Sequence, residues 1–178
     1  MTTSYNTILG TDTANTLIGS NGADSIAALA GDDTVIVQGD DLVYLDSGND
    51  SLSLNSNITS GTVYGGEGND TFAVTATAYN SLLAGDEGND TISLSAAPLT
   101  STLWGGSGKD SLFINDDVTG VTISGGGTSA TTNDGDDTIR VSGTFASALA
   151  QGNAGNDTLY IGGKIDASTA RGGAGNDT

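Results

Sequence analysis

Aspartate recurs in this sequence at the sixth position of a short glycine-rich motif, and its carboxylate is the group best placed to do chemistry. The copy that begins at Gly65 reads Gly-Gly-Glu-Gly-Asn-Asp-Thr-Phe-Ala, and altered copies begin at Gly85, Gly105, Gly152 and Gly172. The sixth-position aspartates are Asp33, Asp50, Asp70, Asp90, Asp110, Asp137, Asp157 and Asp177, with Asn15 in line before them. If the copies stack in register, these carboxylates form one column.

Carboxylates stacked in a column would repel one another. At a strand spacing of about 4.8 Å, two neighbouring carboxylates repel by about 0.9 kcal/mol even at the dielectric constant of water. Summed over the column, this repulsion is comparable to the roughly 5–15 kcal/mol that stabilises a whole domain. Further acids stand nearby at Asp46, Glu67, Asp86, Glu87, Asp134 and Asp136. The column therefore predicts cations between its members.

Calcium is the cation that these ligands favour, because carboxylates and backbone carbonyls are all oxygen donors. Ca²⁺ accepts about six to eight oxygens in loose geometry, whereas Mg²⁺ requires a stricter octahedron. Zinc would favour His or Cys, and the sequence has neither. The glycines permit positive φ and let the backbone approach an ion closely. The candidate metal-binding residues are Asp24, Asp33, Asp41, Asp50, Gly65, Glu67, Asp70, Gly85, Glu87, Asp90, Gly105, Asp110, Asp137, Gly152, Asp157, Gly172 and Asp177.

The alternative is that these aspartates only form solvated turns. A single turn residue, however, has no reason to recur as an aligned column of eight.

The elements that would position these residues follow from the repeats. Early copies run in tandem as Gly10–Ile18, Gly19–Ala27, Ala28–Ile36, a shortened Val37–Tyr44, and Leu45–Ser53. Beyond them the motif returns every 20 residues, apart from an insertion at 127–133. Repeats of this length indicate a solenoid. We expect an N-terminal cap at 1–9, a roll with the motif on both edges at 10–53, and a roll with the motif on one edge at 54–178, ending in an incomplete coil.

Apolar columns indicate which solenoid this is. Two columns separated by one residue have the period of a strand; they contain Leu52, Phe72, Ile92, Leu112, Ile139 and Leu159, and Leu54, Val74, Leu94, Ile114, Val141 and Ile161. A third column just before each glycine pair predicts a second strand, and a fourth, from Ile58 to Ile165, lies in the connection. The sequence therefore predicts an all-β parallel β-roll, or flattened β-helix, with coils of about 20 residues and calcium-binding turns mainly along one edge.

The motifs beginning at Gly65, Gly105 and Gly172 resemble the nonapeptide of the RTX, or haemolysin-type calcium-binding, repeat family. The resemblance implies calcium bridging consecutive turns through the sixth-position aspartates and turn carbonyls. It also implies folding driven by extracellular calcium and export by type I secretion. Unlike a standard roll of that family, this chain carries the motif on both edges only near the start, where Asp24 and Asp41 would lie opposite Asp33. Lys109 replaces the usual Asn or Asp at position five.

Composition narrows the functional classes. A net charge of −18 disfavours nucleic acid and anionic membranes as partners, and no apolar run reaches the length of a membrane-spanning helix. With no His and no Cys, Ser-His and Cys-His catalysis is excluded, and we expect no enzyme activity.

Two functions remain open. The first is an extracellular calcium-dependent scaffold that resembles bacterial surface-layer or surface-fibre proteins and associates with itself or with cell-surface partners. The second is an accessory module of a secreted enzyme or toxin. The aromatics Tyr64, Trp104, Phe113 and Tyr160 are expected to point outward from the sheets, either as scattered exposed side chains or as a patch that binds a sugar or a partner.

Overall fold

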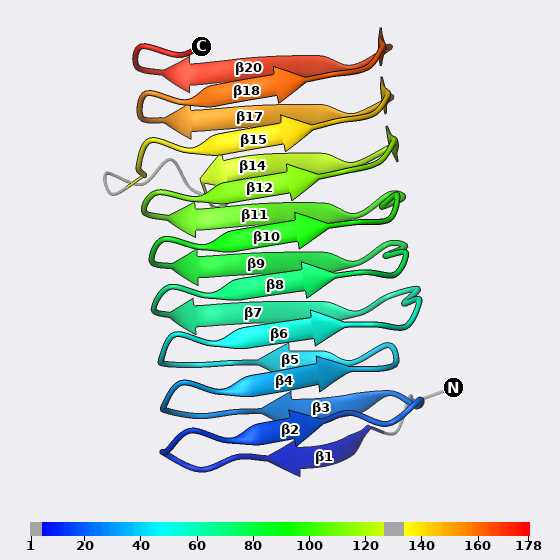
Figure 1. The fold of residues 1–178 in the computed structure, drawn as a ribbon, viewed down its shortest axis with the longest axis vertical. Helices are drawn as coiled ribbons and strands as arrows, with labels where there is room; N and C mark the ends of the chain where they lie inside the picture. The colour runs from blue at the N-terminus through cyan, green and yellow to red at the C-terminus, as the bar shows by residue number, and fades with distance from the viewer. Residues whose placement is uncertain (1–4, 127–133) are drawn as a thin grey trace.

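A regular stack of coils forms the whole of the structure, a computed structural model that describes residues 5–126 and 134–178 (Figure 1). In each coil the chain crosses one sheet, turns, and returns across a second sheet that faces the first. The insertion expected at 127–133 lies outside the described residues, as do residues 1–4 of the expected cap. The stack has about eight turns of about 20 residues and is all-β and parallel, so the predicted fold class is confirmed.

Three parallel sheets make up the stack. The nine-stranded sheet contains, in order, β1 (Asn6–Leu9), β3 (Asp24–Ala27), β5 (Leu42–Tyr44), β7 (Thr62–Glu67), β9 (Leu82–Glu87), β11 (Thr102–Ser107), β14 (Thr122–Gly126), β17 (Leu149–Ala154) and β20 (Thr169–Ala174). The eight-stranded sheet contains β2 (Thr16–Ile18), β4 (Thr34–Val37), β6 (Ser51–Leu54), β8 (Thr71–Val74), β10 (Thr91–Leu94), β12 (Ser111–Ile114), β15 (Thr138–Val141) and β18 (Thr158–Ile161). A short third sheet contains β13 (Val118–Thr119), β16 (Phe145–Ala146) and β19 (Ile165–Asp166).

A thin apolar core lies between the two large sheets. Strands such as β6 and β8 alternate exposed and buried residues, as a half-buried strand does. Leu52 and Phe72 are directly paired and almost fully buried, and they face a column from the other sheet that includes Val63 and Leu83. Because every coil places the same positions inward, the core continues along the stack from one coil to the next.

The connections opposite the glycine turns are also stacked, which the sequence did not predict. Parallel bridges join Ile58 to Ala78 and Leu99 to Thr119, and the series continues into β13, β16 and β19. The apolar column predicted in these connections is not buried at its last member, Ile165, which is 53% exposed, whereas Ile58, Ala78 and Phe145 are fully buried. These side chains close the end of the core that the glycine turns do not reach.

Coil length varies while register is preserved. Hydrogen bonds between equivalent positions join residues 18 and 17 apart in the first coils, 20 apart in most later coils, and 27 apart across the insertion. Strand β6 pairs with β4 on one side and β8 on the other, so the stretches 10–53 and 54–178 share both sheets. In the expected cap, β1 is the first strand of the nine-stranded sheet, with Asn6 opposite Asp24.

Candidate metal centre

The sixth-position aspartates form a continuous file along the glycine-turn edge of the stack. The file consists of Asp33, Asp50, Asp70, Asp90, Asp110, Asp137, Asp157 and Asp177. The backbone N–H of each member donates to Oδ1 of the member in the next coil: Asp70 to Asp90 at 2.7 Å, for example, and Asp90 to Asp110 at 2.7 Å. The series starts at Asn15, whose N–H donates to Asp33, and its N···O distances lie between 2.6 and 3.0 Å.

One carboxylate oxygen of almost every member is left without a partner. Oδ2 is buried and makes no hydrogen bond in Asp33, Asp50, Asp70, Asp90, Asp110, Asp137 and Asp157. These side chains are at most 2% exposed. A buried carboxylate oxygen without a hydrogen bond is costly unless a cation is near it. The file therefore presents one oxygen per coil that is oriented by a backbone N–H and available for a metal ion.

Glycine at the first motif position lets these oxygens lie close against the backbone. A Cβ on Gly65 would collide with Oδ2 of Asp70 and with the carbonyl oxygen of Gly85, one coil further on. A Cβ on Gly85 would collide in the same way with Asp90 and with the carbonyl of Gly105. At each of these turns, therefore, only the absence of a side chain lets a carboxylate oxygen and a backbone carbonyl oxygen lie so close to the same glycine.

The same geometry recurs in later coils but not in two early ones. A Cβ on Gly105, Gly125, Gly152 or Gly172 would meet the Oδ2 of its own turn's aspartate. In the coils of Asp33 and Asp50 the first position is Ala28 or Leu45, and both side chains are fully buried. This close approach to glycine is thus a property of the later coils, together with Gly10 at the start.

The donor set suits calcium. Among the described residues no group of three or more acidic side chains gathers around one point, so carboxylates alone would not complete a site. Each turn instead combines one inward carboxylate with backbone carbonyls, and calcium accepts such mixed oxygen ligands in flexible geometry.

The pKa values of most aspartates in the file are raised because their carboxylates are buried away from water. Burial, the largest cause, raises the pKa of Asp50 to about 6 and the pKa values of Asp70, Asp90 and Asp110 to about 7. Burial likewise raises the pKa of Asp137 to about 8. Neighbouring carboxylates add to the increase, and the donated N–H groups oppose it. Near neutral pH these side chains therefore require a proton or a cation.

The turn backbone is built for glycine at its fourth position as well. Gly68 and Gly88 have φ of 126° and 134°, which L side chains rarely adopt, and a Cβ on Gly88 would collide with the Gly68 carbonyl oxygen. By contrast, Gly22 stands at the same motif position on the opposite edge without a positive φ, and its nearest neighbour would be Ser20 Oγ at 3.6 Å.

A shorter pair of aspartates occupies the opposite edge. The N–H of Asp24 donates to Oδ1 of Asp41 at 2.8 Å, and both side chains are at most 2% exposed. Oδ1 of Asp24 and Oδ2 of Asp41 are buried without partners. A Cβ on Gly19 would lie only 2.7 Å from Oδ2 of Asp41, so the carboxylate packs against this glycine. This pair repeats the arrangement of the file on the edge where the sequence predicted it.

Glu67 and Glu87 lie elsewhere. They are paired in register at the ends of β7 and β9, and their side chains are exposed to solvent. The structure therefore does not bring these two predicted ligand carboxylates into the file, because the third motif position points outward.

The fifth motif position forms a second ladder, which the motif spacing did not predict. The N–H and Nδ2 of Asn69 both donate to Oδ1 of Asn49, and Asn89 donates to Asn69 in the same way. The N–H of Lys109 donates to Asn89, but a lysine side chain has no acceptor to offer the next coil. A further stretch of this ladder joins Asp136, Asn156 and Asn176. In this ladder each side chain accepts the backbone N–H of the following coil, whereas each aspartate of the file accepts the N–H of the preceding coil.

Asp134 adds a carboxylate beside the file. Its Oδ2 accepts the N–H of Ala154 at 2.9 Å, and its Oδ1 is buried without a partner. Burial is the largest cause of the raised pKa values of Asp110, Asp137 and Asp157. The charge of Asp134 is a further cause. Asp134 was noted in the sequence only as an additional acid, because the insertion obscures its place in the motif.

Comparison with known families agrees with this geometry. Residues 6–36, 38–55, 64–96 and 149–163 match the model of the RTX calcium-binding nonapeptide repeat, and together they cover more than half of the chain. The stacked aspartate turns and the match define a calcium-binding β-roll. The chain belongs to the RTX calcium-binding nonapeptide repeat family, which confirms the predicted family. A search of curated proteins gave no match.

The described residues contain no helix with the length and apolar character needed to cross a membrane.

Proposed function

We propose that this protein is an extracellular structural repeat protein whose folding and assembly are driven by calcium, as part of a bacterial surface layer or surface fibre. The observation that carries the proposal is the aspartate file. From Asp33 to Asp157 its carboxylates are buried at intervals of one coil, and each of these retains an oxygen that no protein group satisfies. Proteins of this family are typically secreted, so export by a type I system and a place outside the cell belong to the same proposal.

The residues of the chain prepare the turns for the ion. The backbone N–H of one coil fixes Oδ1 of the next, and Oδ2 then lies against the first-position glycine of its own turn, close to a backbone carbonyl oxygen. Asp70, Asp90, Asp110 and the carbonyls of Gly85 and Gly105 would hold ions in the central coils. Calcium, when bound, supplies positive charge that offsets the repulsion between successive carboxylates. Because each aspartate contacts the neighbouring coil, binding couples one coil to the next.

A scaffold accounts for these acids better than a catalyst does. The aspartates of the file accept backbone hydrogen bonds in a repeated pattern and are buried, whereas catalytic carboxylates must reach a substrate. We therefore propose that the repeats are not an enzyme. Self-association or binding to cell-surface partners is the corresponding role of the outer faces, and a net charge of −18 disfavours nucleic acid.

A second candidate is an accessory module of a secreted enzyme or toxin. The Asp24–Asp41 pair favours it, because a roll with the motif on both edges is the standard form that the resemblance implies. Light scattering in calcium separates the two candidates: a scaffold forms ordered assemblies as calcium is added, and an accessory module stays monomeric.

The first test of calcium-driven folding is far-ultraviolet circular dichroism. Protein stripped with a chelator is titrated with calcium, and magnesium at the same ionic strength is the control. Binding coupled to folding should appear as β signal that calcium restores and magnesium does not. A stripped protein that is already fully folded, and whose stability calcium leaves unchanged, would overturn the proposal.

A further inference from the structure

A pocket of about 300 Å³ lies on the outer face of the nine-stranded sheet, where this face meets the glycine turns, and is lined by Tyr44, Asp46, Tyr64, Gly66 and Asp86. Tyr44 ends β5 and Tyr64 lies in β7, and the two are direct partners in the sheet. Their rings are stacked, with centroids 5.3 Å apart and an angle of 11° between the planes. The wall of the pocket is therefore a pair of rigid aromatic rings with one orientation.

Two carboxylates stand on either side of a residue without a side chain. Gly66 is paired with Asp86, and Asp46 occupies the same motif position one coil before Gly66. Gly66 carries no side chain, so none stands between the two carboxylates in the lining of the pocket, and a Cβ on Gly66 would collide with the carbonyl oxygen of Asp46. They belong to the second motif position, so they are distinct from the aspartate file, whose members occupy the sixth.

The chemistry of this lining selects a cation that carries hydrogen-bond donors. Apart from the two phenol groups, the polar side chains that line the pocket are carboxylates, which accept hydrogen bonds when ionised. None of the lining residues is basic, so the chain itself supplies no neutralising partner there. A planar guanidinium fits both features, because it stacks on aromatic faces while donating to carboxylates.

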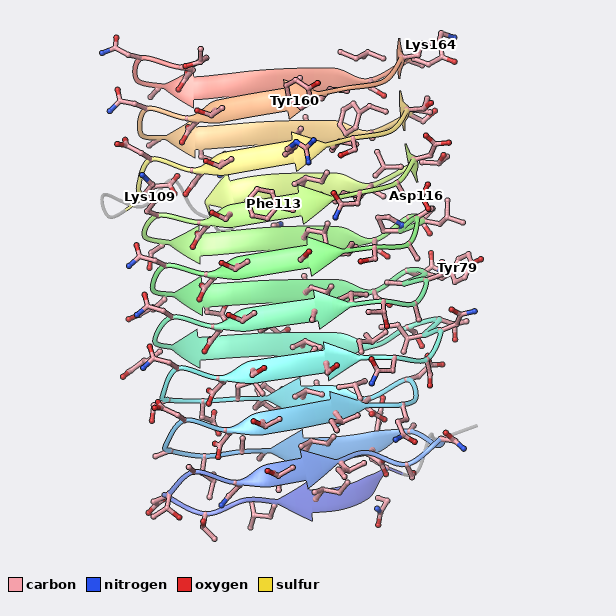
Figure 2. The ribbon with its side chains drawn as sticks, viewed as in Figure 1. Tyr79, Lys109, Phe113, Asp116, Tyr160 and Lys164 are labelled. Atoms are coloured by element: carbon pink, nitrogen blue, oxygen red, sulfur yellow. The ribbon has the colours of Figure 1, made fainter. Side chains whose placement is uncertain are left out.

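The protein already contains one such contact. On the outer face of the eight-stranded sheet, the guanidinium of Arg140 lies 5.5 Å from the centroid of the Tyr160 ring, its partner in the neighbouring coil. Tyr160 is one of the exposed aromatics labelled in Figure 2. Stacking of a guanidinium on a tyrosine is thus compatible with the spacing of these coils. The Tyr44–Tyr64 pair has the aromatic surface and the acids, but the arginine must come from elsewhere.

We propose that this pocket binds the side chain of an arginine presented by a partner protein. Tyr64 and Tyr44 provide the stacking surface, and Asp46 and Asp86 receive the N–H groups of the guanidinium. The volume, at the lower end of the range for ligand pockets, suits a single side chain rather than an oligosaccharide.

The test uses the calcium-loaded protein and isothermal titration with N-acetyl-arginine amide. The matched control ligand is N-acetyl-citrulline amide, which has nearly the same shape without the charge. We expect the arginine compound to bind at least about tenfold more tightly than the citrulline compound, the ratio expected for hydrogen bonds to charged groups. Equal binding of the two, or binding of a neutral methyl glycoside in preference to both, would overturn the proposal. Competition by excess calcium at this pocket would overturn it too, since the carboxylates would then be a metal site.

Variants locate the binding. Asp86→Asn and Asp46→Asn should each weaken binding of the arginine compound about tenfold, and Tyr64→Leu should weaken it about two- to fivefold. Tyr160→Leu, on the other sheet, is the control and should leave this affinity unchanged. If the pocket variants bind as tightly as the parent protein while Tyr160→Leu binds more weakly, the pocket is wrongly assigned. The ligand comparison on the unaltered protein remains decisive even if a variant does not fold.

Discussion

Replacing Asp90 by Asn should change the stability of the protein in opposite directions with and without calcium. Asp90 lies in the middle of the aspartate file, is 2% exposed, and accepts the N–H of Asp70 through Oδ1. Asparagine keeps an Oδ1 that can accept the same N–H, so the hydrogen bond between coils is retained. The substitution therefore isolates the negative charge.

Without calcium, Asp90→Asn removes two like-charge contacts, with Asp70 and with Asp110. At a coil spacing of about 4.8 Å, each contact costs about 0.9 kcal/mol at the dielectric constant of water. The variant should therefore gain about 2 kcal/mol or more at pH 8, where the parent carboxylate, whose burial raises its pKa to about 7, is mostly ionised. With calcium, the variant loses a charged ligand, and each tenfold loss of calcium affinity costs about 1.4 kcal/mol.

Urea unfolding followed by circular dichroism measures the change in the free energy of unfolding in both conditions, once in calcium and once in chelator. If the parent protein is unfolded in chelator, the variant should show more β signal than the parent there and should need more calcium to fold completely. The matched control is Glu87→Gln, which removes one charge from the same turn but at an exposed side chain. It should change the free energy of unfolding by no more than about 0.5 kcal/mol, in calcium or in chelator. A variant that loses stability equally in both conditions would refute the view that charge, rather than shape, makes the file depend on calcium.

Three further predictions concern the turns. Gly88→Ala should cost at least about 1–3 kcal/mol because of its positive φ alone, whereas Gly22→Ala, at the same motif position without that strain, should be nearly neutral in thermal melts; equal effects would contradict the turn geometry. Asn69→Ala removes an acceptor from the fifth-position ladder and should lower the free energy of unfolding by about 0.5–1.5 kcal/mol with or without calcium, so an effect confined to calcium would assign Asn69 to the ion site. Burial raises the pKa values of Asp70 and Asp137 to about 7 and about 8, far above the unfolded value of about 3.9. The calcium-free folded protein therefore binds more protons than the unfolded chain, and its resistance to urea should fall as pH rises from 5 to 8. A resistance to urea that does not change over this range would contradict the prediction.

The fold was predictable because the repeat length fixes the register. With the motif returning every 20 residues from Gly65, each apolar column has only one place to stack, and the structure pairs Leu52 with Phe72 accordingly. The stacking of the sixth-position aspartates was predictable for the same reason. A periodic sequence thus specifies which residues are neighbours without any knowledge of side-chain direction.

What the sequence did not reveal depends on direction and on unrepeated residues. Asn69 looks like an ordinary turn residue, and only the structure shows its side chain reaching to the neighbouring coil. The exposure of Glu67 follows from the outward direction of the third position. Tyr44 belongs to the shortened copy, so its pairing with Tyr64 requires the change in coil length to be counted correctly.

The connections posed a different difficulty. Beyond the single apolar position they have no common sequence, yet parallel bridges and short strands stack them into a third sheet. Their order is imposed by the turns and strands on either side, so a search for local strand patterns does not find it. The connection edge is visible in Figure 2, where Tyr79, Asp116 and Lys164 lie on the side opposite Lys109.

The hydrogen bond from Asp110 to Asp137 spans 27 residues and is 2.8 Å long, the same length as the bond from Asp50 to Asp70, which spans 20. The turn thus accepts additional chain between its second and third positions without any change in the step to the next coil. For protein engineering, this makes the segment between Gly126 and Asp134 a natural grafting site. A foreign peptide inserted there would leave the spacing of the other coils of the rod unchanged.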